Sequence, residues 1–201
     1  MTPLPLDQSF NDTQRRILDA AVECVRQWGI DKTSLNDIAK QARVTRPTVY
    51  RYFSSRNEVL TTAMLQSGVN LGRRMMAHID SFEDPADRFI EALLFALAEF
   101  PKEPYLGIIL QTDLNSYVSQ DAMNNAQGWD LSMMLTREIL RDVDIPEADL
   151  EEITEVTIRM ILSLLLMKGP KPRPPEDWRA FLTRRLLPML GLDHYPRKPG
   201  H

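Results

Sequence analysis

VTRPTVYRYFSSR, residues 44–56, contains three arginines, two tyrosines and no acidic residue. The whole chain of 201 residues has a formal net charge of −4, so this basic run differs from the rest of the sequence. Residues 1–60 hold nine Lys/Arg and seven Asp/Glu, a balance of +2, whereas the remainder holds fifteen and twenty-one, a balance of −6. A local basic surface on an acidic protein predicts a polyanionic partner that binds at one place.

The same stretch predicts a short helix with two different faces. Thr45 can cap its start, and Pro47 lies in the first turn, where a missing N–H costs little. Val49 and Phe53 are four residues apart, so they share one side of the helix, which we expect to be buried. The polar and basic residues then point to solvent.

Two helices are predicted before this stretch. The first follows Asn11 or Asp12 and ends at Gly29, and the second starts with the capping-box-like run SLND at 34–37. Apolar spacing predicts an inner face in each helix, made of Ile17, Leu18, Ala21, Val22, Val25 and Trp28 in the first and of Ile38 and Ala39 in the second. Two short helices joined by a tight turn, the second rich in Arg, Thr and Tyr, match the helix-turn-helix arrangement.

The residue types on the outer face fit the chemistry of a DNA duplex. Arginine can bond guanine O6 and N7, and threonine and tyrosine hydroxyls can bind phosphate oxygens. An acidic residue would repel the phosphates, and none occurs between Lys40 and Arg56. We expect Arg46, Pro47, Tyr50 and Arg51 to face the major groove, and Thr48, Tyr52 and Arg56 to reach phosphates. The other interpretation is an ordinary solvated surface on which the tyrosines only pack.

The rest of the chain also predicts helices, at about 57–79, 85–100, 104–113, 120–141, 147–168 and 175–190, because apolar residues recur at three- and four-residue spacing. The expected fold is all-α. An N-terminal three-helix DNA-binding domain with the helix-turn-helix, residues 1–56, precedes a larger helical ligand-binding and dimerisation domain, residues 57–201. The most apolar stretch, ILSLLLM at 161–167, is too short for a membrane span.

Several short runs together form a recognisable pattern: TSLNDIA at 33–39, VT at 44–45, VYRYF at 49–53 and SR at 55–56, then Leu60. ILDAAVECVRQWG at 17–29 precedes them. In this combination the sequence resembles the N-terminal signature of the TetR/AcrR family of bacterial transcriptional regulators. There are two departures. Arg43 occupies the turn position where the family usually has glycine, and Arg56 stands where it usually has lysine.

The resemblance implies a set of DNA contacts. The bases are expected to be contacted by Arg46, Pro47 and Arg51. The sugar-phosphate backbone is expected to be contacted by Thr48, Tyr50 and Tyr52, and phosphates by Ser34, Thr33 and Arg56. The complete set of expected DNA-binding residues is Thr33, Ser34, Thr45, Arg46, Pro47, Thr48, Tyr50, Arg51, Tyr52 and Arg56.

The last two predicted helices are apolar over a broad surface. A helix that buries only one stripe would need a narrower apolar surface. Packing this pair against its copy would form a four-helix interface and a two-fold homodimer, as the resemblance also implies. Such a dimer predicts a palindromic operator. The other interpretation is that these helices complete the core of a monomer. The expected interface residues are Ile158, Leu162, Leu165, Trp178, Phe181, Leu182 and Leu186.

Methionines and aromatic residues are frequent between these two regions. The resemblance implies a pocket there for a small-molecule inducer, and such side chains would suit an apolar or amphipathic ligand. Each of these residues could equally be ordinary core. The candidate ligand-binding residues are Met75, Phe95, Tyr105, Gln111, Tyr117, Trp129 and Met133.

The sequence favours a regulator over an enzyme. The three histidines, His78, His194 and His201, are scattered, and none has metal-ligand spacing with Cys24 or a carboxylate pair, so we expect no catalytic residue, no metal site and no cofactor. Cys24 is expected to be structural. The first interpretation is a cytoplasmic, ligand-responsive repressor. Its expected partners are double-stranded DNA, a small-molecule inducer and a second copy of the chain, and we expect no membrane partner. The second is a helical small-molecule carrier or sequestering protein that does not read DNA.

Overall fold

The computed structural model of the chain describes residues 10–103, 105–109, 126–167, 169 and 173–198. These residues form two compact units, one within the ranges 1–70 and 100–124 and the other within 71–99 and 125–201. The division between them falls inside one long helix, α4 (Arg56–Ile79). The predicted domain boundary after residue 56 therefore stays a prediction.

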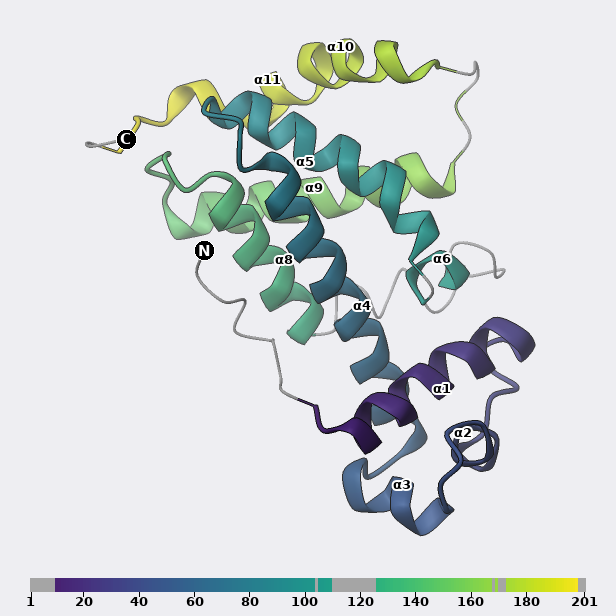
Figure 1. Cartoon of the computed structure of the whole chain (residues 1–201). Helices are drawn as coiled ribbons and strands as arrows, with labels where there is room; N and C mark the ends of the chain where they lie inside the picture. The colour runs from purple at the N-terminus through teal and green to yellow at the C-terminus, as the bar shows by residue number, and fades with distance from the viewer. Residues whose placement is uncertain (1–9, 104, 110–125, 168, 170–172, 199–201) are drawn as a thin grey trace. The chain divides into compact units, whose positions relative to one another are not determined.

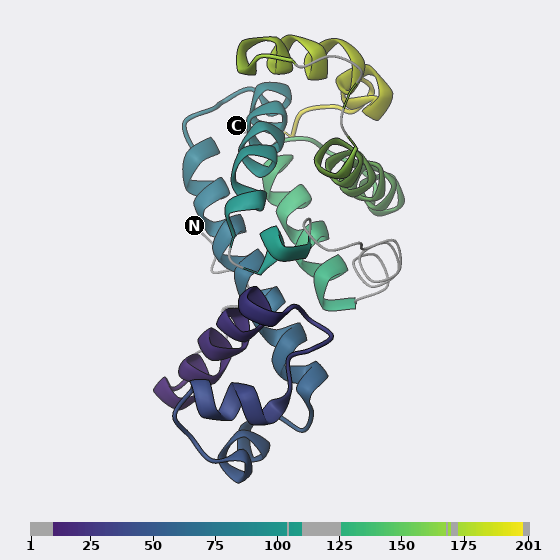
Figure 2. The ribbon, with the colours of Figure 1, turned by 90° about the vertical axis from the view of Figure 1, so that its right-hand side faces the viewer.

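The N-terminal unit contains the three short helices that the sequence predicts. They are α1 (Asp12–Trp28), α2 (Leu35–Gln41) and α3 (Arg46–Tyr52), followed by the start of α4; η1 (Phe100–Lys102) and α6 (Leu106–Ile109) also belong to this unit. α2 is seen end-on in Figure 1 and lengthwise in Figure 2, whereas α3 is seen lengthwise in Figure 1, so the two helices cross. This is a helix-turn-helix.

The core of this unit is built as the apolar spacing predicts. Ile17, Ile38 and Val49 are fully buried, and Phe53 is 3% exposed. Trp28 is a correction: it was expected in the core but is 44% exposed. α1 ends at this residue, so the indole ring lies beyond the last buried turn of the helix.

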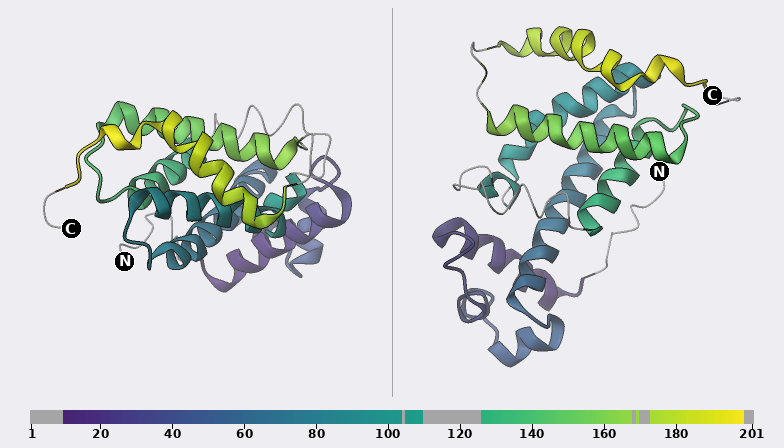
Figure 3. Two further views of the ribbon diagram at one scale, coloured as in Figure 1. Left: turned by 90° about the horizontal axis from the view of Figure 1, so that it is seen from above. Right: turned by 180° about the vertical axis from the view of Figure 1, so that it is seen from behind.

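The second unit is also helical. It contains the end of α4 with α5 (Pro85–Glu99), α8 (Ala126–Ile139), α9 (Glu147–Leu166), α10 (Pro175–Arg185), α11 (Leu187–Leu190) and η2 (Leu192–His194). α5 is its central helix and packs against α8, α9 and α10. The α9 and α10 helices can be followed in both views of Figure 3.

The prediction of one continuous helix near the C-terminus is wrong. The sequence predicts a single helix over 175–190, but α10 ends at Arg185 and α11 starts at Leu187. Pro188 explains the break, because it has no N–H to donate to the carbonyl four residues earlier and its ring clashes there. Parts of the helices predicted at 104–113 and 120–141 lie outside the described residues.

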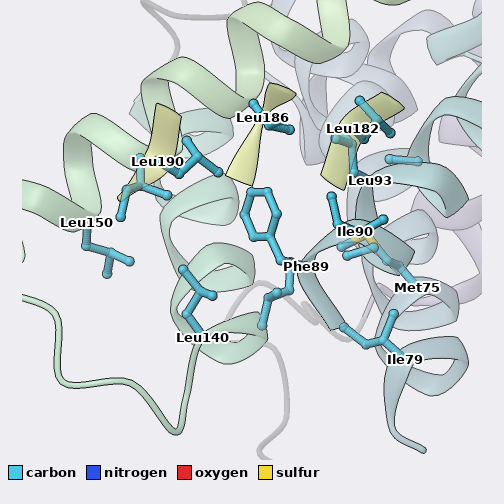
Figure 4. Packing of buried hydrophobic residues seen from close by; sticks show 14 of the residues in the cluster. Met75, Ile79, Phe89, Ile90, Leu93, Leu140, Leu150, Leu182, Leu186 and Leu190 are labelled. Carbon is cyan, nitrogen blue, oxygen red and sulfur yellow. The ribbon is translucent and has the colours of Figure 1, made fainter. Parts of the chain in front are cut away.

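The apolar core of the second unit gathers around α5. Phe89, Ile90 and Leu93 of this helix are at most 3% exposed and meet α10 and α11 on one side (Figure 4). Leu182, Leu186 and Leu190 point from α10 and α11 toward them (Figure 4). Within the described part of the chain, no helix combines the length and the apolar character needed to cross a membrane.

A buried arginine connects three segments of the chain in this core. The Arg88 side chain is 1% exposed and donates to the backbone carbonyls of Ile139 and Phe82, at 2.6 and 3.2 Å. It also pairs with Asp142 Oδ2 at 2.6 Å. These acceptors lie at the end of α8, in the turn before α5 and in the α8–α9 loop, so one guanidinium holds all three together.

We predict that Arg88→Met lowers the free energy of unfolding by about 3–5 kcal/mol, because the Asp142 carboxylate and the carbonyls would lose a buried cationic donor. Urea unfolding followed by circular dichroism measures this loss. Arg159→Met is the matched control, because Arg159 is 63% exposed and pairs, among the described residues, with Glu155 one turn away. A surface pair of this kind contributes about 0.5 kcal/mol or less. Equal losses in both variants would contradict a structural role for Arg88.

Candidate nucleic-acid interface

α3 presents a polar face because its apolar residues are fixed in the core. Val49 and Phe53 are buried, so the other sides of this seven-residue helix are left to solvent. Four residues predicted for the DNA groove are exposed, as expected: Arg46, Pro47, Tyr50 and Arg51. Thr48 and Tyr52 flank them and are half-buried.

Each arginine of α3 is held by a tyrosine. Arg46 Nη2 donates to the Tyr50 hydroxyl at 3.1 Å, and its guanidinium carbon lies 5.4 Å from the centre of that ring. Arg51 Nη2 donates to the Tyr52 hydroxyl at 2.9 Å, with the ring centre at 4.8 Å. Among the residues that the structure describes, no carboxylate pairs with either guanidinium. The sequence predicted these residue types on one surface, but not that they pair.

The caps of α2 and α3 are made by hydroxyl groups at the predicted positions. The Thr45 side chain accepts from the Thr48 amide at 3.2 Å, and the two threonine hydroxyls lie 2.8 Å apart. The Ser34 side chain accepts from the Asp37 amide, and its hydroxyl donates to Asp37 Oδ2 at 2.5 Å. This hydrogen bond lowers the pKa of Asp37. The Ser34 hydroxyl therefore has an anionic neighbour that competes with a DNA phosphate.

Two of the predicted DNA contacts do not have their side chains on this surface. Thr33 is 2% exposed, and its hydroxyl donates to the Gly29 carbonyl at 2.8 Å. Arg56, at the first position of α4, turns inward and donates to the carbonyls of Ile30 and Thr33. Each donor is already used to hold the α1–α2 connection, so we no longer expect a phosphate contact from either side chain.

The turn between α2 and α3 keeps a left-handed backbone without glycine. Arg43 has φ 54°, a conformation that costs a non-glycine residue about 1 kcal/mol. Arg16 of α1 supports this turn, since its Nη2 donates to the carbonyls of Ala42 and Arg43 at 2.5 and 3.3 Å. Nothing in the local sequence indicated this role of Arg16, because its acceptors lie 26 and 27 residues away.

The candidate ligand-binding residues are divided between the two units. Met75 and Met133 are buried in the core of the second unit, and Phe95 and Trp129 are half-buried and pack against that core. Tyr105 belongs to the N-terminal unit and is 3% exposed. Burial raises the pKa of Tyr105 to about 12, and the Arg56 guanidinium acts in the opposite direction. The remaining two candidates, Gln111 and Tyr117, lie outside the described residues.

The predicted dimer residues fall into two groups. Leu182 and Leu186 are 1% and 2% exposed and fill the chain's own core, so they are corrections to the predicted interface. Leu182 on α10 and Leu186 just after it point toward α5 (Figure 4). The spacing of apolar residues could not distinguish this inner side from the outer side of the helix. The other five residues keep part of their surface exposed: Ile158, Leu162, Leu165, Trp178 and Phe181.

The inward position of Arg56 gives a prediction that separates structure from DNA contact. Arg56→Ala should lower the free energy of unfolding by about 2–3 kcal/mol, because two carbonyls lose a charged donor. The slope of log Kd for duplex DNA against log salt should not change, since no phosphate contact is removed. Urea unfolding and fluorescence anisotropy at four salt concentrations measure the two effects.

Arg15→Ala is the control for this experiment. Arg15 carries the same charge, is 63% exposed and lies 3.8 Å from Asp12 on the surface of α1, so its removal should cost little stability. If Arg56→Ala flattens the slope of log Kd against log salt and leaves the free energy of unfolding unchanged, Arg56 contacts a phosphate after all.

Comparisons with known proteins agree with this geometry. The pattern of the bacterial regulatory proteins of the tetR family matches residues 17–63. The "Probable acrEF/envCD operon repressor" of Escherichia coli K12 is 30% identical over 190 residues, which cover 94% of this chain and 82% of that protein. An HTH-type transcriptional regulator of Mycobacterium tuberculosis is 29% identical over 92% of this chain and 90% of its own length. A TetR-family regulator from Streptomyces coelicolor has the same fold, with a TM-score of 0.64 at 20% identity over 87% of this chain and 100% of that one. The chain therefore belongs to the tetR family of bacterial regulatory proteins and is a helix-turn-helix transcriptional regulator.

Proposed function

We propose that the chain is a homodimeric repressor that binds a palindromic operator through α3 and leaves it when a small apolar or amphipathic ligand binds. The observation that carries the proposal is the exposed face of α3. Arg46 and Arg51 are both exposed on this helix, and no described carboxylate neutralises them. Guanidinium groups in this position fit guanine edges in a major groove.

A partly exposed apolar stripe on α9 supports the dimer. Ile158, Leu162 and Leu165 lie on one side of this helix and keep part of their surface exposed. Leu166 continues the stripe and is 48% exposed. Trp178 and Phe181 of α10 are also half-buried and pack edge to face, with ring centres 5.8 Å apart. A second copy related by a two-fold axis would cover these side chains and duplicate the α3 surface.

Duplication of α3 has a consequence for the DNA. Two recognition helices of a two-fold dimer meet the duplex about one helical turn apart, or 34–36 Å. The operator should then consist of two half-sites in inverted orientation. The Escherichia coli relative is described as an operon repressor, which supports repression as the direction of control.

Ligand response rests on thermodynamic coupling. If a ligand lowers operator affinity by some factor, the operator must lower ligand affinity by the same factor. The apolar side chains around Phe95 and Trp129 in the second unit suit a ligand with a large apolar surface. The competing function, a carrier that does not read DNA, predicts ligand binding that is independent of any duplex.

Binding to the DNA upstream of the chain's own gene tests the proposal. Wild-type protein should bind this duplex at least about a thousandfold more tightly than a scrambled duplex at physiological salt. Arg46→Ala or Arg51→Ala should lose about 1–3 kcal/mol of this discrimination, because each removes a possible guanine contact. Fluorescence anisotropy with both duplexes measures it. An equal loss on both duplexes would place the arginine on phosphates, and no specific binding by the wild type would favour the carrier.

The dimer is tested by a charge on the apolar stripe. Leu162→Glu should weaken the dimer by at least about 2 kcal/mol, roughly thirtyfold in Kd, because a carboxylate would be buried without a partner. Analytical ultracentrifugation measures the change. Ser163→Glu introduces the same residue at the next position, which is exposed and lies off the stripe, and should leave the dimer intact. Equal dimer Kd values for the two variants would place the interface elsewhere.

A further inference from the structure

We infer that Tyr50 and Tyr52 determine specificity by holding Arg46 and Arg51 in position to read guanine, rather than by binding phosphates themselves. The inference rests on the proposed function, since it concerns how α3 selects a sequence. It changes the role expected of both tyrosines, which the family resemblance assigns to the DNA backbone.

The first pair follows from helix geometry. Residues 46 and 50 are one helical turn apart, so their side chains lie on the same side of α3. Arg46 reaches along the helix and donates to the Tyr50 hydroxyl at 3.1 Å, while the guanidinium carbon stays 5.4 Å from the ring centre. This distance is within the range of a cation–π contact. Arg46 therefore meets both the ring and the hydroxyl of one residue that is itself 44% exposed.

The second pair uses adjacent residues. Side chains at 51 and 52 leave the helix about 100° apart, so they meet only if the arginine folds toward the ring. Arg51 does so, with a hydrogen bond of 2.9 Å to the Tyr52 hydroxyl and a distance of 4.8 Å to the ring centre. Tyr52 is half-buried, which fixes its ring more firmly than that of Tyr50. Two arginines of one short helix thus have the same kind of neighbour by different geometry.

The contacts leave the arginines able to read a base. A guanidinium carries five N–H donors, and each tyrosine hydroxyl takes one of them. Guanine O6 and N7 need two more, so a bidentate contact is still possible. An arginine that is already restricted loses less side-chain freedom when it binds, which favours the one base whose acceptors fit its position.

The competing role for a tyrosine hydroxyl is donation to a DNA phosphate. A phosphate contact is the same for every base sequence, so its loss weakens binding uniformly and reduces the salt dependence. Loss of a positioning contact instead weakens binding to the preferred sequence more than to others. The two roles therefore differ in base preference, which can be measured position by position.

The decisive variant is Tyr50→Phe, which keeps the ring and removes only the hydroxyl. Full-length wild type, Arg46→Ala, Tyr50→Phe and the double variant are each used to select duplexes from a randomised 30-base-pair library. Arg46→Ala should abolish the guanine preference at one position of each half-site. Tyr50→Phe should reduce that same preference roughly three- to tenfold, and the double variant should be no worse than Arg46→Ala. Tyr52→Phe should act in the same way at the position that depends on Arg51.

Tyr195→Phe is the matched control, because it removes a hydroxyl that donates to Asp149 in the other unit. It should leave every base preference unchanged. A second measurement does not need DNA: NMR of the 15N-labelled Arg46 side chain should show slower guanidinium rotation in the wild type than in Tyr50→Phe.

The outcomes separate the inference from the proposed function. If Tyr50→Phe weakens all duplexes equally, or if the two variants affect different positions, the positioning role is wrong while DNA reading stands. If guanidinium rotation is the same with and without the hydroxyl, the positioning role is also wrong. If the wild type selects no sequence at all, the proposed function fails; the NMR result then still decides whether the tyrosine restrains the arginine.

Discussion

The burial of Val49 and Phe53 is the constraint on which the DNA-facing surface depends. α3 has seven residues, and a helix of that length is not stable in water by itself. Its orientation is set by these two side chains, which are buried in the N-terminal core and are four residues apart. Since side chains around a helix keep fixed angles, anchoring Val49 and Phe53 also fixes the directions in which the exposed Arg46 and Arg51 leave the helix.

Part of the positive charge near α3 is used inside the protein. Of the five basic residues from Lys40 to Arg56, Arg56 turns inward to backbone carbonyls. Arg16, outside that run, acts in the same way on the turn after α2, where it supports the left-handed Arg43. The number of phosphates that the unit can neutralise is therefore smaller than the count of basic residues suggests, and so is the expected salt dependence.

The sequence predicted features that depend on neighbouring residues and missed those that depend on distant ones. Helix caps and the inward face of α3 follow from spacings of three and four, and the structure confirms them at Ser34 and Val49. The inward turn of Arg56 could not be predicted, because its acceptors lie 23 and 26 residues earlier. Leu186 was assigned to the dimer because spacing identifies an apolar face but not what covers it. The break at Pro188 did have a local signal, the proline itself.

The structural arginines of this chain differ from the arginines expected to contact bases in the hydrogen-bond acceptors that they have in the absence of DNA. Arg88 and Arg56 donate to several backbone carbonyls, and Arg88 also to a carboxylate, so a duplex could recruit them only by leaving buried acceptors unsatisfied. Arg46 and Arg51 each donate to one neutral hydroxyl on the surface. A hydrogen bond of that kind restricts the side chain and leaves further N–H donors for guanine, which is the combination that a selective contact requires.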